Sequence, residues 1–262
     1  MDGTRPVRYD AALACRELAE SDRTLARLME RAGPFTLRLK QTASPFEALL
    51  ESIIHQQLHG RAARTIHDRV LALFAGGQPT PEGLLQLPDS QLRAAGLSAG
   101  KLAALRDLAE KSCSGTVPAL STLRRMADEE IIAHLTQVRG IGVWTVEMLL
   151  IFYLGRPNVL PVKDYGVRKG FALTFGKLPE GAPVRAEDLP DAATLEGRAR
   201  RWRPWCSVAS WYLWRACDLA AQAEKAGAGG GPASLPTKQS SKWSAERSKQ
   251  RSGQRPTPKR EK

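Results

Sequence analysis

The feature that most constrains the fold of this chain is Gly140-Ile141-Gly142, a short break between two apolar patterns. The apolar residues before and after the break recur at helical spacing: Ile131, Ile132, Leu135 and Val138, then Val143, Val146, Met148, Leu149 and Leu150. Glycines on both sides of one apolar residue allow backbone conformations that a Cβ forbids, and they let another molecule approach closely. The segment therefore predicts two helices joined by a tight hairpin.

Such a hairpin leaves backbone N–H groups without a partner at the start of its second helix. Unpaired amides and the helix dipole together favour an anion such as a phosphate. The candidate contact residues on this interpretation are Gly140, Ile141, Gly142, Val143 and Thr145. An ordinary turn between two helices explains the same glycines. The hairpin alone leaves both interpretations open.

Three further motifs occur in a fixed order with the hairpin. They are Ile53-Ile-His-Gln-Gln-Leu58, then Asp164 within Pro161-Val-Lys-Asp-Tyr-Gly-Val-Arg168, and Trp202-Arg-Pro-Trp205. Together with Gly140-Ile-Gly-Val-Trp-Thr145, they make about residues 20 to 220 resemble the helix-hairpin-helix (HhH-GPD) DNA glycosylases. The resemblance is greatest to the bacterial DNA-3-methyladenine glycosylase II type. That branch usually has proline where this chain has Arg139, a change expected to make the hairpin less rigid.

The resemblance implies an all-α glycosylase fold with two lobes and a cleft between them, over residues 1–225. The sequence pattern itself predicts helices almost throughout, at about residues 46–57, 61–74, 98–108, 128–137, 143–154, 164–175, 191–201 and 204–224. Only Phe35–Leu39 alternates like a strand. The residues before Ser44 are too few for the β-rich N-terminal domain of some family members.

The C-terminal residues 226–262 differ in composition from the rest of the chain. They hold nine Lys or Arg and two Glu, which gives +7 of the chain's formal charge of +12. Their apolar content is too low to offset chain entropy, which predicts a disordered basic tail. A basic tail can hold DNA through counterion release. A solubilising tail with no binding role is the alternative.

The resemblance implies a role for Asp164 as the catalytic carboxylate. Hydrolysis of an N-glycosidic bond generates positive charge on the sugar, which a carboxylate beside C1′ stabilises. By itself, Asp164 is also a typical helix N-cap, because residues 165–169 continue helically. Both roles can coexist. The sequence does not decide whether the carboxylate also activates the attacking water.

The residue two positions after Gly142 distinguishes two reaction types within the family. Bifunctional relatives carry a lysine nucleophile there, whereas this chain has Trp144. The resemblance therefore implies a monofunctional glycosylase that leaves an abasic site. Trp144, Met148 and Trp214 match the positions of the base pocket, where an electron-rich aromatic face attracts a cationic alkylated purine. Met148 stands where the family often has an aromatic residue. The alternative interpretation of the two tryptophans is that they are ordinary buried core residues.

Two further groups of residues have roles implied by the resemblance. A base must leave the duplex to be excised, and the gap is filled by a wedge residue, here Gln56, Gln57 or Leu58. A polar helix end is the alternative explanation of the two glutamines. The family's hairpin often binds a monovalent cation, Na⁺ or K⁺, through backbone carbonyls. Their positions here are Thr136, Val138 and Ile141.

Cysteine usage and hydropathy limit the remaining possibilities. Cys15, Cys113, Cys206 and Cys217 form no C-x-x-C pair, which counts against an iron-sulfur cluster and favours reduced thiols. No apolar run has membrane-spanning length, and the N-terminus lacks a signal-peptide core. We expect a monomer in the cytoplasm, associated with the nucleoid, that needs no cofactor for catalysis.

The resemblance thus implies a base excision repair enzyme that hydrolytically excises alkylated purines, of the 3-methyladenine and 7-methylguanine type, from damaged double-stranded DNA. Two alternatives remain open at this point. One is a glycosylase for deaminated or etheno bases, which would use the same residues in a pocket of different shape. The other is a non-enzymatic helix-hairpin-helix protein that only binds DNA. In that case, Asp164 and the tryptophans would have no role in catalysis.

Overall fold

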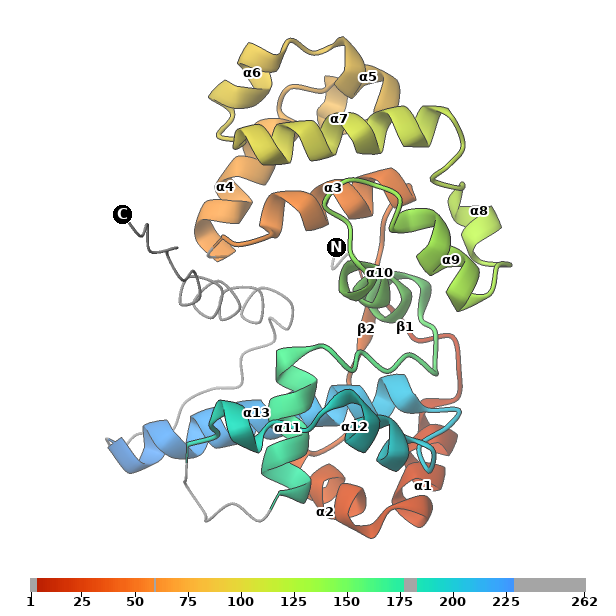
Figure 1. The fold of residues 1–262 in the computed structure, drawn as a ribbon, viewed down its shortest axis with the longest axis vertical. Coiled ribbons are helices and arrows are strands. Elements are labelled where there is room, and N and C mark those ends of the chain that lie inside the picture. The colour runs from red at the N-terminus through yellow and green to blue at the C-terminus, as the bar shows by residue number, and fades with distance from the viewer. Residues whose placement is uncertain (1–3, 59, 177–182, 229–262) are drawn as a thin grey trace, which may run out of the picture.

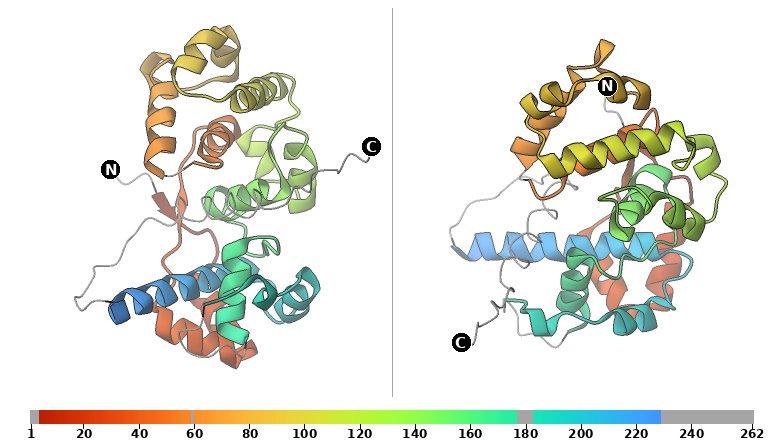
Figure 2. Two further views of the ribbon diagram at one scale, coloured as in Figure 1. Left: turned by 60° about the vertical axis from the view of Figure 1, so that its left-hand side comes forward. Right: turned by 45° about the horizontal axis from the view of Figure 1, so that its top comes forward.

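The computed structural model describes residues 4–58, 60–176 and 183–228, and in these the chain is mostly helical. The helices gather into two lobes, with a short sheet and a central helix between them (Figure 1). The all-α fold class is confirmed. The two-lobed arrangement is also visible in the rotated views of Figure 2.

The first lobe is one continuous stretch of the chain. Its helices are α3 Pro45–His55, α4 Gly60–Leu71, α5 Pro81–Gln86, α6 Asp89–Ala94, α7 Ala99–Cys113, α8 Leu120–Leu123 and α9 Asp128–Leu135, with a 3-10 turn at Ala75–Gly77. Helix α7 packs against α3, α5 and α6. The apolar residues of α3 are buried, and Ser44 caps that helix by accepting a hydrogen bond from the N–H of Glu47.

The second lobe combines the two ends of the described chain. Its helices are α1 Ala11–Ser21, α2 Arg23–Ala32, α11 Tyr165–Phe175, α12 Ala192–Ala199 and α13 Cys206–Ala228, with a 3-10 turn at Ala186–Asp188. Helix α13 packs against α1, α2 and α11. Because α1 and α2 pack on a helix almost two hundred residues later, this lobe is held together by contacts between distant parts of the sequence.

The segments between the lobes are α10 and a two-stranded sheet. Helix α10 Val143–Leu149 continues into a π-helical turn, η2, at Leu150–Leu154. Strands β1 Thr4–Pro6 and β2 Arg38–Lys40 pair antiparallel, and β2 contacts η2. The hairpin, residues 136–142, connects α9 to α10.

The differences from the sequence expectations have local physical causes. The strand predicted at 35–39 lies at Arg38–Lys40 instead, where Leu39 packs in the core and β1 supplies a partner. The helix predicted at 143–154 has regular α-geometry only to Leu149, and the π-turn follows. Helix α13 runs to Ala228, so residues 226–228, predicted as tail, are helical. The remainder of the predicted tail lies outside the described residues.

Among the described helices, none combines the length and the hydropathy needed to cross a bilayer.

Candidate active site

Asp164 lies at the end of the connection between η2 and α11, and its side chain is 2% exposed. It is the N-cap of α11, because its Oδ1 accepts a hydrogen bond from the N–H of Val167 at 2.8 Å. The sequence interpretation of Asp164 as a helix cap is therefore correct. The same carboxylate also has partners that capping does not require.

Two indole N–H groups donate to this carboxylate. Trp144 Nε1 donates to Oδ2 at 2.7 Å, and Trp214 Nε1 donates to Oδ1 at 2.8 Å. Trp144 comes from the first turn of α10 and Trp214 from the middle of α13, so the carboxylate joins the central helix to the second lobe. The structure thus brings together Asp164 and both tryptophans predicted for the base pocket.

Glycines in α11 allow α13 to come close enough for the contact between Trp214 and Asp164. A Cβ on Gly166 would lie 2.7 Å from Trp214 Cδ1, and a Cβ on Gly170 would lie 1.9 Å from the carbonyl oxygen of Leu213. Real Cβ atoms do not make such contacts, so a side chain at either position would push the helices apart. These two glycines are positioning residues that sequence reasoning missed, because nothing local distinguishes them from other helical glycines.

Trp214 has a second aromatic neighbour, Phe152 of η2. The two rings stack with centroids 5.6 Å apart and planes inclined by 25°. Phe152 is partly exposed, as are Met148 and Trp144. Trp144, Met148 and Phe152 recur every four residues, a helical spacing that would have identified Phe152 as a further candidate for the pocket wall.

The hairpin uses its two glycines differently. Gly140 has a φ of +80°, a left-handed conformation that favours glycine. Gly142 has an ordinary φ of −104°, and a Cβ added to it would meet no atom within 4 Å. Gly142 is therefore not required by internal packing. Its open surface is consistent with the close approach of another molecule.

The exposed part of the hairpin is small and well defined. Gly140, Gly142 and Val143 are exposed, and in the described part of the chain no hydrogen bond uses their N–H groups. Ile141 is buried and its N–H donates to the Val138 carbonyl at 3.0 Å. Thr145 is only 6% exposed and its N–H donates to Gly142. Ile141 and Thr145, which were also predicted to contact DNA, are buried, and their contact with DNA stays a prediction.

Two side chains fix the hairpin to the first lobe. Asp107 of α7 accepts the backbone N–H of Arg139 at 2.6 Å, and Gln56 Nε2 donates to the Gly140 carbonyl at 2.9 Å. Burial alone would raise the pKa of Asp107, but the hydrogen bond from Arg139 and the ammonium of Lys111 lower it below its ordinary value. The rigidity expected to be lost with the family's proline is thus supplied by a bond that proline cannot make.

The three wedge candidates lie in different environments. Gln56 is held by its bond to the hairpin, and Leu58 is half-buried. Gln57 is exposed, with a φ of +58°, the only positive φ of a non-glycine residue among those described. A left-handed residue costs about 1–2 kcal/mol, and such strain concentrates at functional sites. Gln57 is therefore the wedge candidate that the geometry favours.

Thr136, Val138 and Ile141 carry the carbonyls predicted to hold a monovalent cation. Thr136 is the C-cap of α9, and a helix C-terminus favours a cation. The Val138 carbonyl accepts one hydrogen bond, from Ile141, and a carbonyl oxygen has a second lone pair. The donor set, uncharged oxygens beside a negative helix end, fits Na⁺ or K⁺. In the described residues, no group of three or more His, Cys, Asp or Glu side chains could hold a metal ion.

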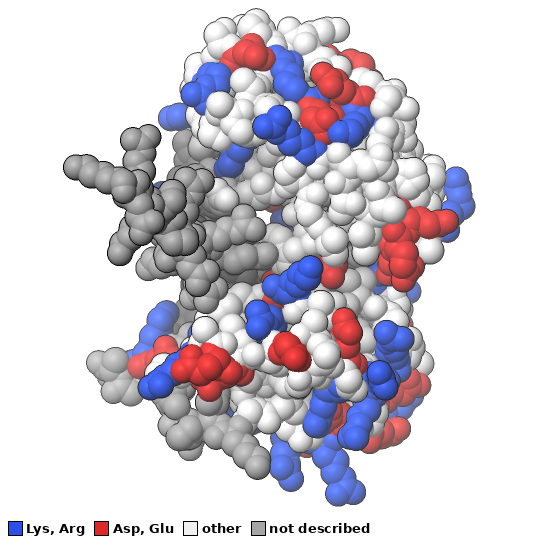
Figure 3. Space-filling view, in the orientation of Figure 1, with Lys and Arg blue, Asp and Glu red and all other residues white. Residues whose placement is uncertain are grey.

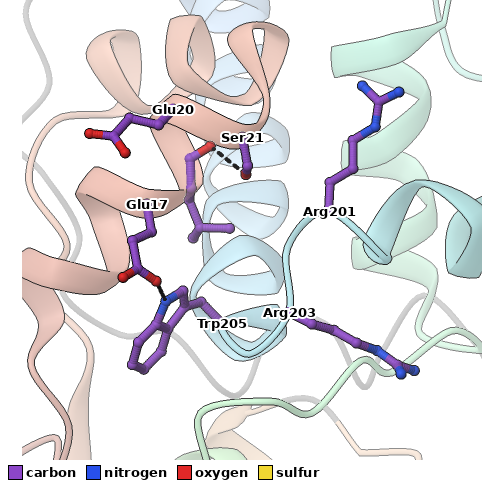
Figure 4. Close-up of a pocket in the computed structure, with 7 residues that line it drawn as sticks. Glu17, Glu20, Ser21, Arg201, Arg203 and Trp205 are labelled. Atoms are coloured by element: carbon purple, nitrogen blue, oxygen red, sulfur yellow. Dashed lines mark hydrogen bonds between the residues drawn. The ribbon is translucent and has the colours of Figure 1, made fainter.

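A surface hollow of about 410 Å³ lies between α1 and the segment before α13, and neither Asp164 nor its two tryptophans line it (Figure 4). Trp205 Nε1 donates to Glu17 across it at 2.6 Å. The guanidinium groups of Arg201 and Arg203 do not converge with the carboxylate of Glu20 on a common point (Figure 4). The chemistry of Asp164 is thus separate from this hollow.

Charge is distributed without a dominant sign on the face drawn in Figure 3. Lys, Arg, Asp and Glu side chains alternate over both lobes there. The chain's positive excess is therefore not displayed as a basic band on this face, in agreement with the large share of that excess in residues 226–262.

Comparison with known proteins adds a family to this geometry. Residues 50–183 match the family described as HhH-GPD superfamily base excision DNA repair protein. DNA-3-methyladenine glycosylase 1 of Schizosaccharomyces pombe is 35% identical over 205 residues, which cover 78% of this chain and 86% of that protein. DNA-3-methyladenine glycosylase of Saccharomyces cerevisiae is 32% identical over 233 residues, 78% of each chain.

Solved structures agree with the sequence comparison. The S. pombe 3-methyladenine DNA glycosylase in complex with abasic DNA superposes with a TM-score of 0.67 at 34% identity, covering 78% of this chain and 95% of that one. DNA-3-methyladenine glycosidase from Bacillus halodurans superposes with a TM-score of 0.70 at 34% identity, covering 80% of this chain and 91% of that one.

Proposed function

The chain belongs to the HhH-GPD superfamily of base excision DNA repair proteins. We propose that it is a monofunctional DNA glycosylase, which excises alkylated purines from duplex DNA by hydrolysing their N-glycosidic bonds. The observation that carries the proposal is the carboxylate of Asp164, buried and hydrogen-bonded by Trp144 and Trp214. A helix cap alone accounts for the bond from Val167, but not for two indole donors from two other helices. In a protein that only bound DNA, the arrangement would serve only to join the central helix to the second lobe.

The carboxylate acts on the charge that develops as the bond between base and sugar breaks. The departing base takes the bonding electron pair and the deoxyribose becomes cationic at C1′. Water then gives its hydroxyl group to C1′ and its remaining proton to the solution. A negative group fixed beside C1′ stabilises this transition state without having to reorient. The indole N–H groups and the α11 cap fix the orientation of Asp164 before the substrate arrives.

The tryptophans also connect the carboxylate to base recognition. Since their N–H groups donate to Asp164, both indole rings lie directly beside the carboxylate. A purine alkylated at N3 or N7 carries positive charge, which is attracted to an aromatic face. We therefore place 3-methyladenine and 7-methylguanine among the substrates, a proposal that the names of the similar yeast enzymes support.

Access to the site requires the base to leave the duplex. Gln57 is exposed on residues 56–58, and Gln56 ties that segment to the hairpin through the Gly140 carbonyl. We propose that Gln57 fills the gap left by the base while the hairpin contacts the backbone of the same duplex. The bound abasic DNA of the S. pombe relative supports DNA as the ligand.

Strand cleavage is not part of the proposed reaction. The family's lysine position holds Trp144, whose N–H is engaged with Asp164. Lys163 adjoins Asp164 but is exposed, whereas the carboxylate is buried. We also propose that catalysis needs no cofactor and that the protein acts as a monomer in the cytoplasm, associated with the nucleoid. A cation on the hairpin carbonyls would have a structural role.

The test is incubation of the protein with duplex DNA methylated at purines, followed by analysis of released bases and strands. We expect free methylated purine to be released and the strand to break only after alkali treatment. Release accompanied by breaks without alkali would contradict the monofunctional assignment. Release of hypoxanthine or ethenoadenine from matched duplexes, with methylated purines retained, would contradict the substrate assignment.

A further inference from the structure

Arg139 occupies the tip of the hairpin, next to the exposed backbone of Gly140. Arg139 is exposed, and within residues 4–58, 60–176 and 183–228 no hydrogen bond or ion pair involves its guanidinium. Its only anchored part is the backbone N–H, which Asp107 accepts. The main chain is therefore fixed, whereas the guanidinium has no hydrogen-bond or ion-pair partner among these described residues and acts on Asp107 only through its charge.

The surroundings of Arg139 determine what its side chain can reach. The carboxylate of Asp107, which accepts the N–H of Arg139, also accepts from Lys111. Lys111 Nζ lies 2.6 Å from its Oδ1 and 2.8 Å from its Oδ2. The negative charge of Asp107 is thus already paired with the ammonium of Lys111. On the other side, Gln56 connects the hairpin to the segment that carries Gln57. Arg139 is therefore the neighbour of the hairpin residue that Gln56 connects to the segment carrying Gln57.

We propose that Arg139 contacts a phosphate of the DNA backbone, and that Asp107 positions it by holding its main chain. The proposal rests on the proposed function, because it names an additional contact within the same DNA interface. A guanidinium offers several donors in a fork that matches phosphate oxygens, which a proline at this position would lack. The substitution of arginine for proline then adds one ionic contact and retains the hairpin's shape.

A phosphate contact has a measurable signature in salt. Each phosphate neutralised by a cationic side chain adds about 0.9 to the slope of log affinity against log salt. Between 50 and 200 mM salt, loss of one contact therefore changes the salt-induced loss of affinity by about three- to fourfold. A residue that acted only through the shape of the hairpin would change affinity without changing this slope.

The experiment measures binding to a duplex containing a tetrahydrofuran abasic-site analogue, at KCl concentrations from 50 to 200 mM. Arg139→Gln keeps the N–H for Asp107 and removes the charge, and Arg139→Lys keeps a charge. Arg27→Gln, on the exposed surface of α2 in the second lobe, removes the same charge elsewhere. We expect the slope to decrease by about 0.9 in Arg139→Gln and to stay near the wild-type value in the other two.

An unchanged slope in Arg139→Gln overturns the inference, whether or not affinity falls. An equal decrease in Arg27→Gln also overturns it, because the effect would then be one of net charge. These outcomes are distinguishable from failure of the proposed function, in which the wild-type protein would neither prefer the abasic duplex nor release methylated purines.

Discussion

At the scale of single residues, Asp164 combines a structural and a chemical role. Its Oδ1 caps α11 through Val167 and also accepts from Trp214, while Oδ2 accepts from Trp144. A carboxylate with three donors from three elements has one available orientation. The sequence predicted Asp164, Trp144 and Trp214 for the site. It did not predict that the tryptophans would donate hydrogen bonds to the aspartate.

Replacing either tryptophan by phenylalanine removes the indole N–H but keeps an aromatic ring, so it tests the hydrogen bond by itself. Trp214→Phe and Trp144→Phe each remove one hydrogen bond to a charged group, of about 1.5–3 kcal/mol. If that bond orients Asp164 in the transition state, the excision rate falls by about ten- to a hundredfold. Single-turnover base release measures the effect. A rate within twofold of wild type in both variants would show that the indole donors do not matter to catalysis.

Gln57 combines backbone strain with exposure, so its effects on stability and on function should have opposite signs. Gln57→Gly relieves a left-handed conformation worth about 1–2 kcal/mol and adds about 0.5–1 kcal/mol of chain entropy cost. We expect the free energy of unfolding to stay equal or rise by up to about 1.5 kcal/mol, while affinity for abasic DNA falls. Urea unfolding and DNA titration test both, and lower stability with unchanged binding would refute the wedge assignment.

At the scale of elements, the pairing of α11 with α13 determines whether the site exists. Gly170 lies against the backbone of Leu213, the residue before Trp214. Because a backbone carbonyl cannot rotate away as a side chain can, the two helices have no tolerance for a methyl group at this point.

Gly170→Ala should therefore destabilise the protein. We expect a loss of at least about 1–3 kcal/mol in the free energy of unfolding, together with reduced excision, since α13 carries Trp214. Gly197→Ala in α12 is the matched control, because its Cβ would meet no atom within 4 Å and alanine favours a helix by about 0.5–1 kcal/mol. Equal stability changes in the two variants, measured by thermal unfolding, would contradict the close-packing account.

The sequence predicted the elements well where local signals were strong. Ser44, Ser98 and Asp191 accept hydrogen bonds at the starts of α3, α7 and α12, and the apolar spacing after each is helical. The π-turn after Leu149 and the anchoring of Arg139 by Asp107 could not be predicted in this way. Both depend on what packs against the segment, which periodicity does not record.

At the scale of the whole molecule, Asp22 links the beginning of the chain to its end. It caps α2 and accepts two hydrogen bonds from Arg198, at 2.7 Å and 2.8 Å, and one from Trp202 at 3.1 Å. These partners lie 176 and 180 residues away. The family resemblance could imply a second lobe, but sequence patterns alone could not place α1 and α2 in it, because no local signal records such distant contacts.

Asp22 should make the stability of this lobe depend on pH in the acid range. Burial alone would raise the pKa of Asp22, but the hydrogen bonds from Arg198 and Trp202 outweigh it and lower the pKa below the ordinary 3.8. A lowered folded-state pKa stabilises the protein above the unfolded pKa, and this contribution is lost as the pH falls through the folded value.

The corresponding variant is Asp22→Asn, which keeps an acceptor oxygen and removes the charge. We expect it to lower the free energy of unfolding by about 1.5–3 kcal/mol at pH 7, and by progressively less as the pH falls below 3.8. Denaturant unfolding of both proteins along a pH series measures the difference. A difference that grows toward low pH would contradict the assigned sign.

The central claim is that the buried carboxylate of Asp164 performs the excision. The most direct measurement compares wild type with Asp164→Asn in release of methylated purines and in affinity for a duplex with an abasic-site analogue. We predict that release falls by about 100-fold or more in the variant, while binding stays within a few-fold. Release that survives the substitution in a folded protein, or DNA binding lost together with release, would contradict the account.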